Sequence, residues 1–222
     1  MQISLRTARA EDTLAIYEIK EQLRLKLEDN VSDGGFLLGT SQSAYEKFIL
    51  EDIVLVAEND HPKRVVGFAI VIKHENLVNS ALFQRAEKVQ WEAVFRTSFN
   101  AKRFAFFEQL GMLNDPSYRV YSKHLAFAIT MEVFDTHEAL FTTTLRYPIK
   151  NTAALPFIRV AGFQQVGMVD EIYPDIGHIK SDVYCLDRGH FLDVINQPKF
   201  KIFVERSRKQ GYANFSDEHF SK

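Results

Sequence analysis

The stretch that decides the fold is LNDPSYRVYSKHLAFAI, residues 113–129. It continues a strand-like run, RFAFFEQLGML (residues 103–113), passes through an Asp-Pro turn and enters a helical pattern. A strand that leads into a helix N-terminus presents unpaired N–H groups and the positive end of the helix dipole, a common setting for bound phosphate. Glycine, which lets phosphate oxygens approach the backbone, is absent from this loop. The loop offers instead charged or hydrogen-bonding side chains: Arg119, Ser122, Lys123 and His124. The alternative is a helix cap followed by a solvated first turn.

Composition excludes several classes of protein. The 222 residues are 46% hydrophobic and 25% charged, as in ordinary globular chains, and the net charge of −2 gives no basic footprint for nucleic acid. No apolar run approaches the roughly 18 residues of a membrane helix, and the N-terminus lacks a signal-peptide pattern, so we expect a cytoplasmic protein without a membrane partner. The single Cys185 and scattered histidines provide no metal-ligand spacing, so we expect no metal, and Cys185 is expected to be a small core residue.

Strand and helix patterns interleave along the chain. The patterns predict strands at residues 2–8, 52–59, 64–74, 103–113, 139–148, 163–172 and 179–188. They predict helices at residues 9–28, 41–51, 77–98, 121–137 and 151–162. This order predicts one α/β (α+β) domain over residues 1–188, with a mixed sheet and a helical insertion at residues 77–98. Residues 189–222 are expected to be a C-terminal helical extension, with a helix around residues 198–211.

Four pieces of the sequence together resemble the GCN5-related N-acetyltransferase (GNAT) superfamily, over residues 3–188. They are ISLRTARAEDTLAIYEI (residues 3–19, with Arg6, Asp12 and Ile16), VLVAENDHPKRVVGFAIV (54–71), DPSYR (115–119, with Pro116, Tyr118 and Arg119) and NTAALPFIRVAGFQQVG (151–167, with Asn151, Gly162 and Phe163). The resemblance implies a mostly antiparallel sheet flanked by helices. It also implies that the fourth and fifth strands splay apart to admit the pantetheine arm of acetyl-CoA.

The resemblance also implies a set of binding residues. The family's pyrophosphate motif, Gln/Arg-x-x-Gly-x-Gly/Ala, falls on Arg119, Val120, Tyr121, Ser122, Lys123 and His124. The end of the splayed strand, with Met112, Leu113 and Asn114, would supply a backbone N–H to the thioester oxygen, and Asn151 would contact the cofactor. Three positions depart from the family pattern. Ser122 stands at the first Gly, His124 at the Gly/Ala position, and Ile158 where many members carry a Tyr that protonates the leaving thiolate.

Two residues are candidates for catalysis. Glu108 lies in an apolar strand and, by period two, would share a face with Leu110 and Met112, where burial would raise its pKa. The alternative is a solvated Glu, or one paired with Arg103. Tyr184 could act as the acid in place of the missing Tyr, or be a core aromatic residue. His178 would line the substrate end of the site, or be an ordinary loop residue.

The sequence therefore predicts an N-acyltransferase that uses acetyl-CoA and a small-molecule or peptide amine. One alternative is a catalytically inactive binding or regulatory module, favoured by Ser122, His124 and Ile158. Another alternative is that the fold binds a longer or different acyl thioester, with Phe106 and Phe107 shaping an apolar tunnel for the acyl chain. The insertion at residues 77–98 would cover the acceptor site, form a homodimer surface or simply pack on the sheet. The acceptor, the acyl chain and the oligomeric state are left open.

Overall fold

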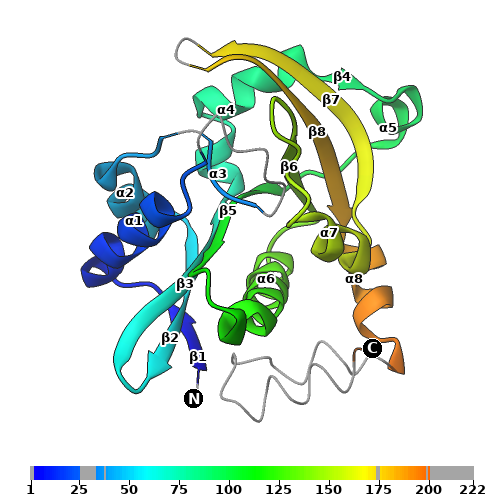
Figure 1. Cartoon of the computed structure of the whole chain (residues 1–222). Helices are drawn as coiled ribbons and strands as arrows, with labels where there is room; N and C mark the ends of the chain where they lie inside the picture. Colours follow the sequence, from blue (N-terminus) through cyan, green and yellow to red (C-terminus); the bar gives the residue numbers. More distant parts are fainter. Residues whose placement is uncertain (1–2, 26–33, 38, 174–175, 199, 201–222) are drawn as a thin grey trace.

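The computed structural model describes residues 3–25, 34–37, 39–173, 176–198 and 200, which form an eight-stranded sheet with the order β1-β2-β3-β5-β6-β8-β7-β4 (Figure 1). The strands are β1 (Ile3–Thr7), β2 (Ile53–Asp60), β3 (Lys63–Ile72), β4 (Gln90–Trp91), β5 (Phe104–Met112), β6 (Ala139–Tyr147), β7 (Gln164–Tyr173) and β8 (Gly177–Asp187). Only β5 and β6 pair in parallel. The prediction of a mixed, mostly antiparallel sheet flanked by helices is confirmed.

Helices cover both faces of this sheet. On one face of β2 and β3 lie α1 (Thr13–Gln22), which follows the short turn η1 (Ala10–Asp12), and α2 (Gln42–Glu51). The Ser41 side chain accepts the Ala44 N–H and caps α2, as the sequence indicated. On the other face lie α6 (Arg119–Phe134), α7 (Leu155–Ala161) and α8 (Arg188–Ile195). Because both faces of β2 and β3 are covered, these strands are apolar over residues 53–57 and 65–72, and polar only toward the turn that joins them.

The segment after β8 begins with a helix that the patterns did not indicate. The Asp187 side chain accepts the His190 N–H at 3.1 Å and starts α8. Phe191 of α8 is fully buried and packs on Phe127 and Phe134 of α6. The helix expected around residues 198–211 lies outside the described residues, apart from its first positions.

The single helix expected over residues 77–98 is wrong. This segment forms α3 (His74–Leu77), α4 (Ala81–Gln84), η2 (Arg85–Lys88), β4 and α5 (Ala93–Ser98). The Ser80 side chain accepts the Phe83 N–H and starts α4, and β4 then pairs with Gly167 and Met168. A Cβ on Gly167 would stand 2.9 Å from the Gln90 carbonyl oxygen, so the glycine admits β4 to the sheet. Trp91 and Phe95 of this segment pack on Phe141 of β6, and Phe99 and Phe104 pack on the same ring.

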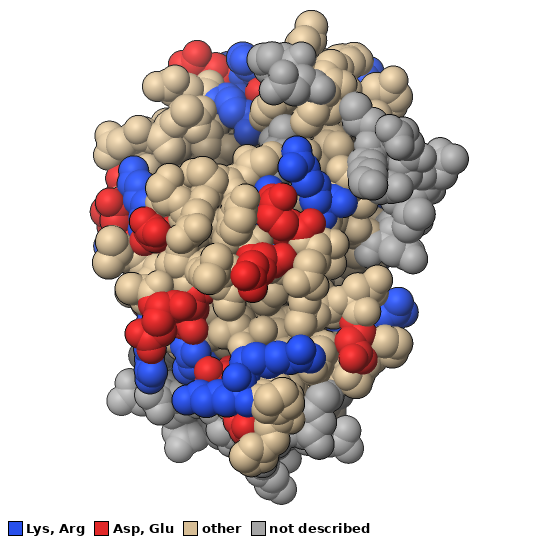
Figure 2. All heavy atoms as spheres, turned by 60° about the vertical axis from the view of Figure 1, so that its left-hand side comes forward, with Lys and Arg blue, Asp and Glu red and all other residues tan. Residues whose placement is uncertain are grey.

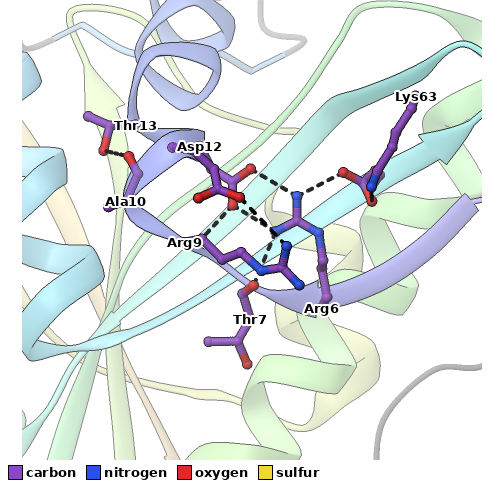
Figure 3. A network of polar contacts seen from close by, with 9 residues as sticks. Arg6, Thr7, Arg9, Ala10, Asp12, Thr13 and Lys63 are labelled. Atoms are coloured by element: carbon purple, nitrogen blue, oxygen red, sulfur yellow. Dashed lines mark hydrogen bonds and ion pairs between the residues drawn. The ribbon is translucent and has the colours of Figure 1, made fainter.

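A network of charged side chains ties β1 to η1 and β2 (Figure 3). The Arg6 guanidinium donates to both carboxylate oxygens of Asp12, at 2.7 and 2.9 Å, and to Glu58 at 2.8 Å. The Asp12 carboxylate also accepts the Arg9 N–H. Burial alone would raise the pKa of Asp12, but the bonds from Arg6 and Arg9 outweigh it and lower that pKa. Arg6 likewise lowers the pKa of Glu58, so the network is ionised at neutral pH.

On the face that carries α1 and α2, Lys and Arg side chains are interspersed with Asp and Glu, with no broad patch of one sign (Figure 2). In the part of the chain that the structure describes, no helix is long and apolar enough to cross a membrane. Cys185 is buried on β8 as predicted, and burial raises the pKa of its thiol to about 12.

The fold should lose stability in mild acid because of His137. Its ring is 1% exposed, Nε2 accepts the His74 N–H at 3.3 Å, and burial lowers its pKa. A group whose folded pKa is lowered contributes stability that is complete above the unfolded pKa of about 6.5 and is lost as the pH falls. We expect the free energy of unfolding in urea to fall from pH 7 to pH 5, with a slope of at most about 1.4 kcal/mol per pH unit from this residue.

The control for this acid effect is a pair of His→Gln variants. His137→Gln should flatten the slope, because Gln does not titrate, whereas His61→Gln in the exposed β2–β3 turn should leave it unchanged. An identical slope in His137→Gln and the unmodified protein would contradict the prediction.

Candidate functional site

The site is built around the place where β5 and β6 separate. The two strands pair over four residues only, Phe104–Phe107 with Ala139–Thr142. β5 then continues to Met112 and β6 to Tyr147 without pairing to each other, and β6 pairs with β8 throughout. The sheet thus opens into a V between its parallel strands, with its apex after Phe107.

Glu108 is the first residue of β5 beyond this apex, and it also lies in a β-bulge. The register between β3 and β5 moves at this point, since Ile70 faces Gln109 whereas Val71 faces Phe107. Glu108 is therefore the extra residue of β5 and has no partner on β3. Exposure along β5 still alternates from Phe104 to Met112, and Glu108, Leu110 and Met112 are all partly exposed, as the period-two pattern predicted. Bulges often redirect a side chain next to a functional site.

Three features of its surroundings act on the pKa of the Glu108 carboxyl. Burial raises its pKa above the ordinary carboxyl value, against the opposing effects of the Arg85 guanidinium and a hydrogen bond from the Gln109 side chain. Burial raises the pKa values of Tyr45 and Tyr173, and the Glu108 charge adds to that effect. Arg85, Tyr45 and Tyr173 therefore lie within electrostatic range of Glu108, whereas Arg103 pairs with Glu75. A carboxylate with a raised pKa is suited to accept a proton near neutral pH.

Backbone groups of β5 line the same opening. The Leu113 N–H donates to the Val66 carbonyl at 2.8 Å, so Leu113 is bonded to β3. Alternate residues of an antiparallel strand direct N–H and C=O to opposite neighbours. Met112 and Leu110 therefore direct their backbone N–H and C=O groups away from β3 and into the V. Met112 is therefore the candidate N–H donor to the thioester oxygen, and the Leu110 N–H lies on the same side of the strand. Asn114 lies exposed beyond the end of the strand.

The loop after β5 enters α6 through one turn of 3-10 helix, η3 (Pro116–Tyr118). The Asp115 carboxylate caps this turn by accepting from the Ser117 N–H at 2.8 Å and the Ser117 hydroxyl at 2.6 Å. The Val120 and Tyr121 amides stand in the first turn of α6, where a helix leaves N–H groups without helical acceptors. Both amides directly follow Arg119, whose side chain is exposed. α6 thus begins shortly after the end of β5, at the mouth of the V, as the sequence indicated; that this helix end binds an anion stays a prediction.

The two departures from glycine lie one turn further into α6. Because α6 starts at Arg119, the amides of Ser122, Lys123 and His124 belong to its regular helical bonding. The Ser122 hydroxyl donates to the Arg119 carbonyl at 2.7 Å, so it bonds back to the backbone of its own helix. Burial lowers the pKa of His124, which keeps its ring neutral. Arg119 and Lys123 supply the exposed positive charge.

The loop after β6 forms the other wall of the V. The Asn151 N–H donates to Leu145 at 2.8 Å, and the Asn151 side-chain oxygen accepts the Ala153 N–H at 3.1 Å. A Cβ on Gly34, whose φ is +98°, would stand 2.6 Å from the Ala153 Cβ. Phe36 meanwhile stacks on Phe68 of β3, so residues 34–37 cross β5 where it diverges from β6. Ile158 of α7 is buried in the core, at 3% exposure.

Tyr184 and Glu108 are not brought into contact by any bond among the described residues. Tyr184 lies opposite Thr142, which pairs with Phe107, so Tyr184 is level with the apex and two strands away, roughly 10 Å. It packs against the core under α6 and α7, and Phe107 contacts Phe157 of α7. Phe106 packs instead with the aromatic residues of the insertion, so Phe106 and Phe107 lie on opposite faces. His178 pairs with Asp170 on the β7–β8 hairpin.

Four residues near Glu108 carried no sequence signal. Arg85 of η2 donates from Nε to both carboxylate oxygens of Glu171, at 2.9 and 3.0 Å, and its guanidinium lies 5.5 Å from the Tyr173 ring centre. On the other side, Tyr45 of α2 donates to the Gln109 side-chain oxygen at 2.8 Å. Arg85 and Glu171 are 86 positions apart, and no local pattern could have paired them.

The solved structures that this chain resembles include several acetyltransferases. Arabidopsis thaliana NAA60 in complex with a bisubstrate analogue superimposes with a TM-score of 0.58 at 12% identity, over 84% of this chain and 98% of NAA60. An N-acetyltransferase from Staphylococcus aureus Mu50 gives 0.57 at 13%, over 85% and 99%. The spermidine/spermine N-acetyltransferase SpeG from Vibrio cholerae gives 0.53 at 13%, over 86% and 98%. The sequence matches no family model and no curated protein. The chain thus has the GNAT fold, as the four sequence pieces predicted.

Proposed function

We propose that the protein is an N-acyltransferase, which moves an acetyl or other acyl group from acyl-CoA to an amine. The observation that carries the proposal is the V between β5 and β6, with Glu108 at its apex and the N-terminus of α6 at its mouth. A fold alone does not assign a function, whereas a base, backbone donors and an anion site on one opening define a reaction class.

The chain's residues would divide the work as follows. Glu108 takes one proton from the acceptor ammonium, so that the amine nitrogen has a lone pair with which to form the new C–N bond as the C–S bond breaks. The Met112 N–H hydrogen-bonds the acyl oxygen as negative charge develops there. Tyr184, level with the apex, gives a proton to the departing sulfur, and the second proton that the nitrogen loses as the amide forms restores Tyr184 through solvent. Acyl-CoA supplies the activated thioester.

The donor would be held by the helix end and by the strand edge. The first-turn amides of α6 and the Arg119 and Lys123 side chains suit a pyrophosphate. The backbone groups of Leu110 and Met112 on the β6 side, which pair with no strand among the described residues, suit the amides of a pantetheine arm. NAA60 has also been solved in complex with acetyl-CoA, which supports the same donor here. We place the reaction in the cytoplasm, with a small-molecule or peptide amine as acceptor and no resident metal.

The direct test is calorimetric titration of the protein with acetyl-CoA and with CoA. We expect micromolar dissociation constants for both. Arg119→Ala should weaken binding roughly 10- to 100-fold, the loss expected for one charged hydrogen bond. Ser122→Gly should leave the affinity unchanged or improve it, since the hydroxyl bonds its own helix, while stability falls by about 1 kcal/mol.

Arg96→Ala, on the exposed side of α5, is the matched control for loss of positive charge. Equal affinities in Arg119→Ala, Arg96→Ala and the unmodified protein would remove the α6 end from the binding site. No binding of CoA at millimolar concentration would overturn the proposed donor.

A non-catalytic binding module is the second candidate, and the buried Ile158 favours it. Ile158 stands where many GNAT members carry a proton-donating Tyr, and its side chain is part of the core. Such a module would bind CoA yet release no thiol with any amine. Thiol release from acetyl-CoA across a panel of polyamines, amino acids and peptides distinguishes the two candidates.

A further inference from the structure

A buried chain of hydrogen bonds leads from α2 to the candidate base. The Tyr45 hydroxyl donates to the Gln109 side-chain oxygen at 2.8 Å, and Gln109 Nε2 donates to the Thr40 hydroxyl at 3.1 Å. Tyr45 is fully buried and Gln109 is 8% exposed. Gln109 follows Glu108 directly, at the bulge that opens the V. The chain of hydrogen bonds thus reaches Gln109, the residue next to Glu108.

The chemistry of these groups fixes the orientation of the Gln109 amide. Burial raises the pKa of Tyr45, so the phenol stays protonated and can donate to an oxygen. With its oxygen on Tyr45, Gln109 directs its NH2 group to Thr40. The same side chain adjoins Glu108 in the chain and lowers the pKa of its carboxyl, the effect expected of an N–H donor. Loss of the Tyr45 hydroxyl would leave the amide oxygen buried without this donor and the amide free to turn.

We propose that Tyr45 is a positioning residue, which acts through Gln109 to hold an N–H donor on the Glu108 carboxylate. The inference deepens the proposed function and rests on it for the role of Glu108. Tyr45 itself packs edge-on against Phe48 and Phe68, and this rigid aromatic setting anchors the far end of the chain.

Other charged groups also act on Glu108, and they must be held constant in any test. Arg85 of η2 favours its ionised form and is itself fixed by Glu171 of β7. The groups that face Glu108 or its partners from the packed elements are Arg85, Lys88, Glu171, Tyr173, Tyr45 and Glu21. Among these groups, and in the part of the chain described, Tyr45 alone bonds directly to the Gln109 side chain. The Tyr45–Gln109 link can therefore be cut alone.

The test compares Tyr45→Phe with the unmodified protein across a pH series. We expect the acidic limb of kcat/KM to move to higher pH by about half a unit or more, since the carboxylate loses part of its hydrogen bonding. Activity should be nearly restored at pH 9. Tyr17→Phe, on α1 and packed against the same cluster, should not move the limb. Gln109→Met, which removes the donor itself, should move it at least as far as Tyr45→Phe.

A second readout does not depend on turnover. Titration of the Glu108 side chain by carbon NMR on selectively labelled protein should show a higher pKa in Tyr45→Phe than in the unmodified protein. Equal pKa values, or an unmoved acidic limb with only a lower melting temperature, would overturn the positioning role. If the protein binds no acetyl-CoA, the proposed function fails, and the NMR comparison still decides the link between Tyr45 and Glu108.

Discussion

Glu108→Gln should lower kcat/KM for amine acylation by about 10²- to 10⁴-fold, the usual contribution of a positioned general base. The change keeps the size of the side chain but removes its ability to take a proton. Acetyl-CoA affinity should stay within about twofold, because the proposed donor contacts lie on the backbone of β5 and on α6. The measurement is steady-state thiol release together with calorimetry of acetyl-CoA.

The pH dependence adds a second signature of the base. Burial raises the pKa of Glu108, so activity of the unmodified protein should fall as the pH drops through that raised value. Glu108→Gln should lose this limb. Glu11→Gln, with a side chain 72% exposed on η1, should change neither rate nor profile. If the Glu108→Gln variant kept both the full rate and the acidic limb of the pH profile, water or another group would have to take the proton.

Stability should move in the opposite direction from activity. A carboxyl whose folded pKa is raised contributes stability that is complete at low pH and is lost as the pH rises through the folded value. At neutral pH Glu108 therefore costs stability, and Glu108→Gln should raise the melting temperature. A purely structural Glu would show the reverse, since its loss would lower the melting temperature. Gain of stability with loss of rate is typical of residues kept for chemistry.

The sequence predicted those parts of the fold that local signals encode. The DHPK turn joined two β-branched runs, Ser41 capped a helix, and Asp115-Pro116 marked the passage from β5 into α6. Each of these depends on residues within a few positions of one another. The GNAT resemblance added the order of the pieces, and hence the parallel pair at which the sheet opens.

What the sequence missed depends on contacts between distant segments. β4 exists because Gly167 leaves room for it, and α1 ends at Gln22 because the Leu25 N–H turns away to the Phe36 carbonyl. The bulge at Glu108 is a mismatch of register with β3, which a period-two pattern cannot reveal. The charges around Glu108 come from η2 and β7.

The V between β5 and β6 belongs to the fold, whereas the charged and polar side chains around Glu108 belong to this sequence. The V follows from the parallel pair, which any chain of this architecture carries. The insertion then brings Arg85 to Glu171 and Glu108, while α2 brings Tyr45 to Gln109. A positive group on one side and a fixed amide on the other both favour the ionised carboxylate, against the burial that disfavours it. The balance of these effects sets the pH at which Glu108 can act.

Arg6→Ala should lower the free energy of unfolding by about 3 kcal/mol at pH 7, because it leaves two buried carboxylates without their shared partner. The Asp12 and Glu58 side chains are only 6% and 13% exposed, and Arg6 bonds both. Lys63, whose Nζ is 4.0 Å from Glu58, is too distant and too exposed to replace it. Urea unfolding measures the loss, with Arg9→Ala, whose side chain is 63% exposed, as the matched Arg control at under about 0.5 kcal/mol.

The penalty of Arg6→Ala should also depend on pH in a defined sense. Arg6 lowers the pKa values of Asp12 and Glu58, so its contribution is complete above the unfolded carboxyl values of about 4 and disappears as the pH falls below them. The difference between Arg6→Ala and the unmodified protein should therefore shrink from pH 7 to pH 3. A difference that stays constant over this range would assign the loss to packing of the Arg6 stem and not to its charge.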